Sequence, residues 1–259
     1  MKHKVQLLAD RFNTIISVWE NVECISLNEA ALGDTLDPYF AVIFDVFYRD
    51  SIPNPEERCK MFGNDISAFE TSHQGTKDRF LVGNKPIRME YKSIEKIDTL
   101  VTIVDKKLES LWFIKDSGTY SYYRLAHGTI LFSRTGWIDT IRQRLSVLGD
   151  DFWLQMRQIY QSKMEHLLND LGAAFFQQDD FNYLISASLF IKTACLTLFC
   201  INRRFEPAHR AYYKQALSLP ILPPAFRTHL DTFIRFDAEI TRERQYSLAQ
   251  LIAKDIVAL

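Results

Sequence analysis

The sequence predicts an α+β fold, with a mixed sheet and helices in the N-terminal part and an all-α helical bundle after it. Short segments rich in β-branched and aromatic residues, typical of strands, occur only before Asp150. After Asp150 the apolar residues recur with a helical period in long segments. Strands at the front of a chain and helices at the back indicate an α+β domain followed by a bundle. We expect these domains over residues 1–140 and 141–259.

The first domain begins with a helix over residues 4–19, whose apolar side chains recur at spacings of three and four. A second helix starts at Asn54-Pro55, because asparagine caps a helix N-terminus and proline suits its first position. A third runs over 93–106 and a fourth over 137–148. Strands are expected at 22–27, 36–48, 79–82, 87–92 and, as a shorter piece, 127–134. The bundle helices are expected near 151–169, 181–201, 207–217, 224–236 and 237–257.

The composition is that of an ordinary globular protein, with 47% hydrophobic and 24% charged residues. The net charge of −1 gives no electrostatic reason for nucleic-acid or membrane binding. The N-terminal residues have no continuous apolar stretch, so we expect no signal peptide. The four cysteines lack metal-site spacing and are expected to be reduced, which favours a cytoplasmic protein: Cys24, Cys59, Cys195 and Cys200.

The stretch 36–48, LDPYFAVIFDVFY, has the composition of a strand buried on both faces. Asp45 lies inside it, and a buried carboxylate is unfavourable unless it is paired, protonated or bound to a cation. Glu90 lies in a second apolar strand, where the alternation places it on one face with Arg88 and Lys92. Two acids on neighbouring strands indicate a shared site for a divalent metal and a phosphate-bearing ligand.

The order of these elements resembles the nucleotidyltransferase superfamily, in which a glycine-containing turn precedes an acid-bearing strand and a later strand carries another acid. The segments DPYFAVIFDVFYRDSIP, FETSHQGTKDRFLV, PIRMEYK and INRRFEP are similar to those of a bacterial family of nucleotidyltransferase-like proteins with a helical C-terminal half. The resemblance spans most of the chain. It implies transfer of a nucleoside monophosphate from a nucleoside triphosphate to a small-molecule hydroxyl, with Mg²⁺ held by carboxylates.

The resemblance assigns roles to individual residues. Asp45 and Glu90 match the second and third metal-binding acids of the family, and Asp37 is the candidate for the remaining acid. Lys77 and Arg88 would neutralise phosphate. The sequence departs from the family pattern at two positions, since the first acid of the Asp-x-Asp pair is replaced by isoleucine and the glycine-serine signature by glycine-aspartate: Ile43 and Gly33-Asp34.

Simpler structural roles compete with these assignments. Asp45 could be a buried acid paired with Arg79 or Arg88, because structural ion pairs use the same residues as active sites. Lys77 and Arg79 either contact phosphate or form a solvated charge cluster. Further candidates for substrate binding are Tyr123 and Arg124, which either stack on a base or pack between domains, and the basic cluster of Arg203, Arg204 and His209.

Three functions therefore stay open on the sequence. The first is a Mg²⁺-dependent nucleotidyltransferase. The second is a binding or regulatory protein that keeps the fold but has lost catalysis, and Ile43 and Asp34 favour it. The third is a ribonuclease in which Arg204 and His209, at the spacing of a family of helical ribonucleases, act on RNA.

Overall fold

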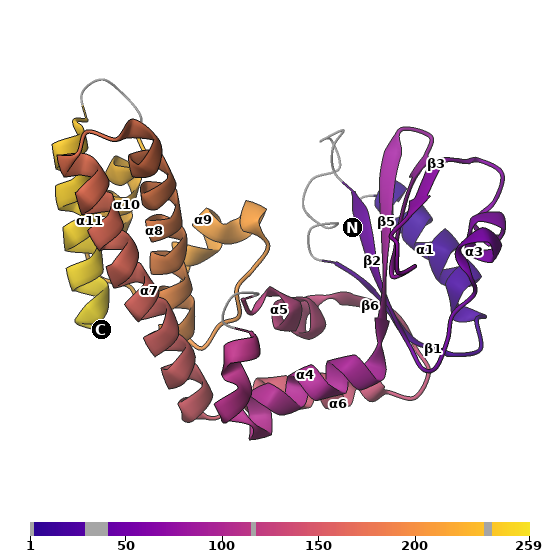
Figure 1. Cartoon of the computed structure of the whole chain (residues 1–259). Helices are drawn as coiled ribbons and strands as arrows, with labels where there is room; N and C mark the ends of the chain where they lie inside the picture. The colour runs from indigo at the N-terminus through magenta and orange to yellow at the C-terminus, as the bar shows by residue number, and fades with distance from the viewer. Residues whose placement is uncertain (1–2, 29–40, 115–117, 236–239) are drawn as a thin grey trace. The chain divides into compact units, whose positions relative to one another are not determined.

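The computed structural model describes residues 3–28, 41–114, 118–235 and 240–259 (Figure 1). It divides into two compact units. The first unit contains Met1–Leu111 and Tyr120–Leu148, and the second contains Trp112–Thr119 and Gly149–Leu259. The division therefore follows Leu148, and the expected boundary between residues 140 and 141 lies inside a helix of the first unit.

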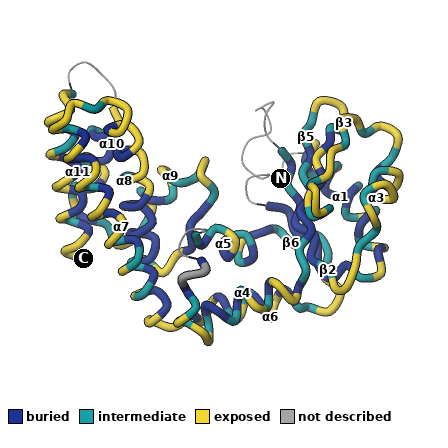
Figure 2. The backbone as a smooth tube through the Cα atoms, viewed as in Figure 1, coloured by how far each residue is buried: buried dark blue, intermediate teal, exposed yellow. Residues whose placement is uncertain are grey.

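The first unit is built on a six-stranded mixed sheet with the order β3-β4-β5-β2-β1-β6. The two central strands, β2 and β5, are parallel, and the other neighbouring pairs are antiparallel. All six residues of β1 are buried, and so are most of those of β2, as expected for the centre of the sheet (Figure 2). The strands are β1 (Val22–Leu27), β2 (Val42–Tyr48), β3 (Ile66–Thr71), β4 (Lys77–Val82), β5 (Lys85–Ser93) and β6 (Thr129–Ser133).

Helices and one apolar core complete the first unit. The core joins α1 and α3 to the sheet through aromatic rings, with the Phe12 and Phe62 centroids 5.6 Å apart and those of Phe62 and Phe80 5.1 Å apart. Asn54 and Glu57 form the capping box of α3, so the expected helix start is confirmed. The helices of this part are α1 (His3–Ser17), α3 (Pro55–Phe62), α4 (Ile94–Lys106), η1 (Leu108–Phe113), α5 (Tyr120–His127) and α6 (Trp137–Ser146).

Two strands differ from the sequence prediction. The central strand begins at Val42, after Ala41, and residues 36–40 of the expected strand lie outside the described residues. The polar stretch 63–75 is not among the strands expected from the sequence, but it contains β3, which pairs with β4 at the edge of the sheet. An edge strand needs few apolar residues because one side of it faces solvent, and none of the residues of β3 is buried.

The second unit is helical, which confirms the α+β class with a helical C-terminal half. Its core is formed by side chains of α7, α8, α10 and α11. The expected helix over 207–217 is a short turn plus α9, and the last helix begins at Arg242 with Thr241 as its N-cap. The helices are α7 (Asp150–Phe176), α8 (Asp180–Ile201), η2 (His209–Ala211), α9 (Tyr212–Ala216), α10 (Phe226–Phe233) and α11 (Arg242–Val257).

Helix α8 is apolar and long enough to cross a membrane by length and composition, and it is the single such helix among the described residues. However, 61% of its most apolar window is buried inside the protein, as is usual for the core helix of a soluble domain.

Candidate functional site

The candidate site lies in the first unit, where the two predicted acids face each other across neighbouring strands. Asp45 on β2 is paired in parallel register with Glu90 on β5. The exposed fraction of Asp45 is 1% and that of Glu90 is 7%. The expectation that both acids lie on neighbouring strands is confirmed. Because the sheet buries them side by side, each carboxylate needs a partner of opposite charge.

Arg124 on α5 is the partner that both acids share. Its Nε donates a hydrogen bond to Asp45 Oδ2 at 2.9 Å, and its Nη2 donates to Asp45 Oδ1. Its remaining terminal nitrogen, Nη1, donates to Glu90 Oε2 at 2.9 Å. One guanidinium thus forms a bidentate pair with the first carboxylate and bridges to the second, which is a geometry that the planar fork of arginine suits.

Lys92 is the second cation of the site. Its Nζ lies 2.8 Å from Asp45 Oδ1 and 3.6 Å from Glu90 Oε2. Burial disfavours the charged form of Glu90, but the nearby charges of Arg124, Lys92 and Lys77 outweigh it and hold the pKa of Glu90 below its usual value. Arg88 Nη1 approaches Glu90 Oε1 at 3.8 Å from the more exposed side. Two acids are therefore surrounded by four basic side chains.

Local contacts hold Arg124 in this position. The hydroxyl of Tyr122, two residues earlier on α5, donates to the backbone oxygen of Leu100 on α4 at 3.1 Å. Arg142 Nε donates to the backbone oxygen of Leu125 at 3.0 Å. Helix α5 is followed by Gly128, where a Cβ atom would lie 2.8 Å from the backbone oxygen of Arg124, so a larger residue does not fit.

A pocket of about 280 Å³ opens beside the ion-pair cluster. Its lining includes the basic residues Lys92 and Lys96 and the hydroxyl-bearing residues Thr76 and Ser121. The backbone N–H of Lys96 donates to Ser93 Oγ at 3.4 Å, and its side chain forms no ion pair with another described residue. Apolar side chains form the rest of the wall, and this combination of apolar walls and a few convergent polar groups is typical of small-molecule sites. The apolar lining includes Phe47, Ile97, Leu100 and Leu125.

The described residues do not fit a metal centre of the kind that the resemblance implies. A Mg²⁺ site needs several oxygen ligands with free lone pairs around a space for the ion. Here the guanidinium of Arg124 and the ammonium of Lys92 occupy the oxygens of Asp45 and Glu90, and no described group of three His, Cys, Asp or Glu residues could hold a metal ion. Asp37, the expected further ligand, and Asp34 lie outside the described residues.

The remaining candidates of the first unit take different positions. Arg79 is exposed on β4 and forms no side-chain hydrogen bond or ion pair with described residues, so it is not the partner of Asp45. Tyr123 is buried, and its ring packs against His127 at 4.5 Å and Tyr120 at 6.4 Å. Lys77, on β4, is paired in register with Glu90 on β5. The positive charges of Lys77, Arg88 and Arg124 therefore lie close to the two acids.

Arg203, Arg204 and His209 belong to the second unit. Arg203 forms an exposed ion pair with Asp150 at 2.7 Å, and His209 Nε2 lies 3.8 Å from Glu206 Oε1. Arg204 makes no ion pair or side-chain hydrogen bond within the described part of the chain. These contacts are those of surface residues.

The sequence analysis did not predict that Lys92 pairs with Asp45 or that Lys96 lines the pocket. A signal for Lys92 was present, because residues at spacings of two share one face of a strand and Arg88, Glu90 and Lys92 follow that spacing. Arg124 was expected to contact substrate or pack between domains. Its pairing with Asp45, over a separation of 79 residues, has no signal in a single sequence.

The fold of this chain, a mixed six-stranded sheet followed by a helical half, has a counterpart among solved structures. Among solved structures, the chain is similar to a nucleotidyltransferase-like protein from Exiguobacterium sibiricum. The two share 12% sequence identity, and the alignment covers 97% of this chain and 74% of that one with a TM-score of 0.52. No protein-family model matches the sequence, and no curated protein matches it. The similarity therefore supports the fold.

Proposed function

We propose that this protein binds a nucleotide through basic side chains, without a metal ion, and does not transfer a nucleotidyl group. The observation that carries the proposal is the Arg124 guanidinium, which bridges Asp45 and Glu90 where a transferase would need free carboxylates for Mg²⁺. Ile43, in place of the first acid of the family pattern, agrees with this function.

Charge supports an anionic ligand. Asp45 and Glu90 are compensated by Arg124 and Lys92, and Lys77 and Arg88 add further positive charge beside Glu90. Lys96 and the Thr76 and Ser121 hydroxyls line the adjoining pocket, where they could donate hydrogen bonds to phosphate oxygens. The apolar wall of the same pocket suits a base or sugar face.

The test is calorimetric titration with each nucleoside triphosphate, in Mg²⁺ and in EDTA, together with an assay for pyrophosphate release. We expect binding of equal strength in both conditions and no release. Lys96→Ala should weaken binding about tenfold, as loss of a charged hydrogen bond does. Lys106→Ala is the matched control, since Lys106 lies in the last turn of the same helix, outside the pocket, and carries the same charge.

A Mg²⁺-dependent transferase is the second candidate, because Asp45 and Glu90 retain the in-register arrangement that the resemblance implies. It predicts binding that needs Mg²⁺, disappears in Asp45→Asn and is accompanied by pyrophosphate release. That result would replace the proposal made above. Absence of nucleotide binding in either condition would remove both functions and leave Asp45 as a structural acid.

A further inference from the structure

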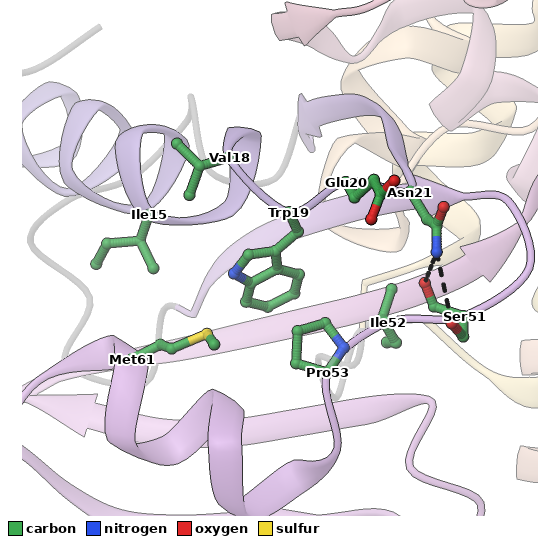
Figure 3. A pocket seen from close by; sticks show the side chains of 9 residues that line it. All are labelled: Ile15, Val18, Trp19, Glu20, Asn21, Ser51, Ile52, Pro53 and Met61. Atoms are coloured by element: carbon green, nitrogen blue, oxygen red, sulfur yellow. Dashed lines mark hydrogen bonds between the residues drawn. The ribbon is translucent and has the colours of Figure 1, made fainter.

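A second pocket, of about 660 Å³, lies in the first unit at the end of α1. Figure 3 shows that one wall comes from the last turn of α1 and the segment after it, and the other from α3 and the segment before it. It shares no lining residue with the pocket beside Lys92. The lining residues are Ile15, Val18, Trp19, Glu20, Asn21, Ser51, Ile52, Pro53 and Met61.

Trp19 is the central residue of this pocket. Its exposed fraction is 6%, yet its indole Nε1 has no hydrogen-bond partner. Figure 3 shows the nitrogen facing the gap between Ile15 and Met61. A buried N–H group that has lost water and gained no acceptor is unfavourable, so such a group in a native protein calls for an explanation.

The indole cannot turn away easily to find another acceptor. The backbone oxygen of Trp19 accepts hydrogen bonds from Val22 N and from Arg134 Nη2, both at 3.1 Å. Its ring packs near Phe62 and Tyr91, with centroid distances of 6.1 Å and 6.3 Å. Met61, by contrast, is 46% exposed and has a flexible side chain that can move aside for a ligand.

The other walls define the chemistry of a ligand. The lining is mostly apolar, and Val18 leaves 77% of its surface exposed at the rim. The Asn21 amide nitrogen is directed to the Ser51 backbone oxygen at 3.2 Å, which ties the two walls together. Glu20 is the one charged residue of the lining, and a carboxylate there repels an anion. The volume is in the range of small-molecule pockets.

We propose that this pocket binds a small neutral molecule that has a flat apolar body and a carbonyl oxygen, and that the oxygen accepts a hydrogen bond from Trp19 Nε1. The body would pack against Ile15, Ile52 and Pro53, and the oxygen would satisfy the unpaired N–H. This site is independent of nucleotide binding, so either proposal can fail without the other.

Three probes of nearly the same shape test the proposal by NMR of the tryptophan indole N–H groups in the 259-residue chain. Acetophenone carries the carbonyl oxygen, isopropenylbenzene has a CH₂ group in its place, and benzoate adds a negative charge. We expect acetophenone to move the Trp19 indole resonance downfield in a saturable manner. The Trp137 indole is the internal control and should not move, because its N–H already faces the Asp98 carboxylate at 3.3 Å and 3.4 Å.

Isopropenylbenzene should bind about two- to tenfold more weakly than acetophenone, the difference that one hydrogen bond makes. Benzoate should also bind more weakly, and Glu20→Gln should reduce its disadvantage. Trp19→Phe should abolish the preference for acetophenone over isopropenylbenzene. Because that variant also removes packing, the comparison of probes on the unaltered protein is decisive. Equal affinity for the two probes, or no saturable shift with acetophenone, would overturn the proposal.

Discussion

Arg124 determines whether the two buried acids of this fold are available for chemistry. A guanidinium has five N–H donors in one plane, so it can pair with one carboxylate through two of them and reach another through a third. In this protein it does so with Asp45 and Glu90. In a metal site, the same oxygens would face a cation that can be exchanged. Here the cation is a side chain of the protein itself, so both acids are compensated without a bound metal ion.

The importance of this residue for stability can be measured with Arg124→Met, which keeps an unbranched apolar stem and removes the charged guanidinium. Of the two described cations that pair with both acids, only Lys92 would then remain, and we expect a loss of about 3–5 kcal/mol in the free energy of unfolding at pH 7. Arg88→Met is the control. Arg88 is partly exposed and 3.8 Å from Glu90, so its loss should stay below about 1 kcal/mol in urea denaturation.

The loss in the free energy of unfolding caused by Arg124→Met should depend on pH. In the natural sequence the pKa of Glu90 is held below its ordinary value of 4.5, so its ionised form stabilises the fold above that pH, and this contribution is lost as the pH falls through the lowered pKa. Without Arg124, burial should raise the pKa of Glu90 instead. The destabilisation by Arg124→Met should therefore be largest at neutral pH and shrink below pH 4.5. A destabilisation that is independent of pH would mean that Arg124 acts through packing alone.

Helix α3 is attached to the sheet by a buried ion pair. Arg58 Nε lies 2.7 Å from Asp78 Oδ2 on β4, and the Tyr91 hydroxyl of β5 donates to the same oxygen at 2.8 Å. The exposed fraction is 2% for Arg58 and 0% for Asp78. Breaking such a pair by removing one charge leaves the other buried without compensation.

We therefore expect Asp78→Asn to lower the free energy of unfolding by about 3–5 kcal/mol. Asp65→Asn is the matched control, because Asp65 pairs with Arg11 in an exposed position. That change should be undetectable in the same thermal or urea denaturation experiment. Equal effects of the two substitutions would contradict the view that burial makes the Arg58 pair important.

Elements such as α3 were predictable from the sequence because their signals are local. Asn54 and Glu57 are three residues apart and form the capping box that the sequence indicates. β3 was missed, because an edge strand with a mostly polar sequence depends on its partner β4 for its conformation. The placement of Asp45 and Glu90 on neighbouring strands was predictable, because their strand contexts are local. Their pairing with Arg124 is a tertiary contact, which no spacing in the sequence encodes.

Each of the two units has its own apolar core, so they are expected to unfold as separate cooperative bodies. Gly118 offers a selective probe of the second unit. Its φ is +73°, and a Cβ there would overlap Glu206 Oε2. Its neighbour Thr119 accepts a hydrogen bond from Glu206 N at 2.8 Å, so a displacement of Gly118 would disturb this contact.

Gly118→Ala should destabilise the second unit by about 1–3 kcal/mol, because alanine is strained at positive φ and the side chain has no space. Gly149→Ala is the control in the same unit, where φ is −67° and no atom lies within 4 Å of the added methyl group.

Hydrogen exchange, followed by mass spectrometry in increasing urea, reports the two units separately. Exchange should accelerate in peptides from residues 149–259 for Gly118→Ala, and in peptides from the first unit for Asp78→Asn. If either substitution accelerated exchange in both units together, the chain would unfold as one cooperative body, and the stability of the Arg124 site would then depend on the helical half as well.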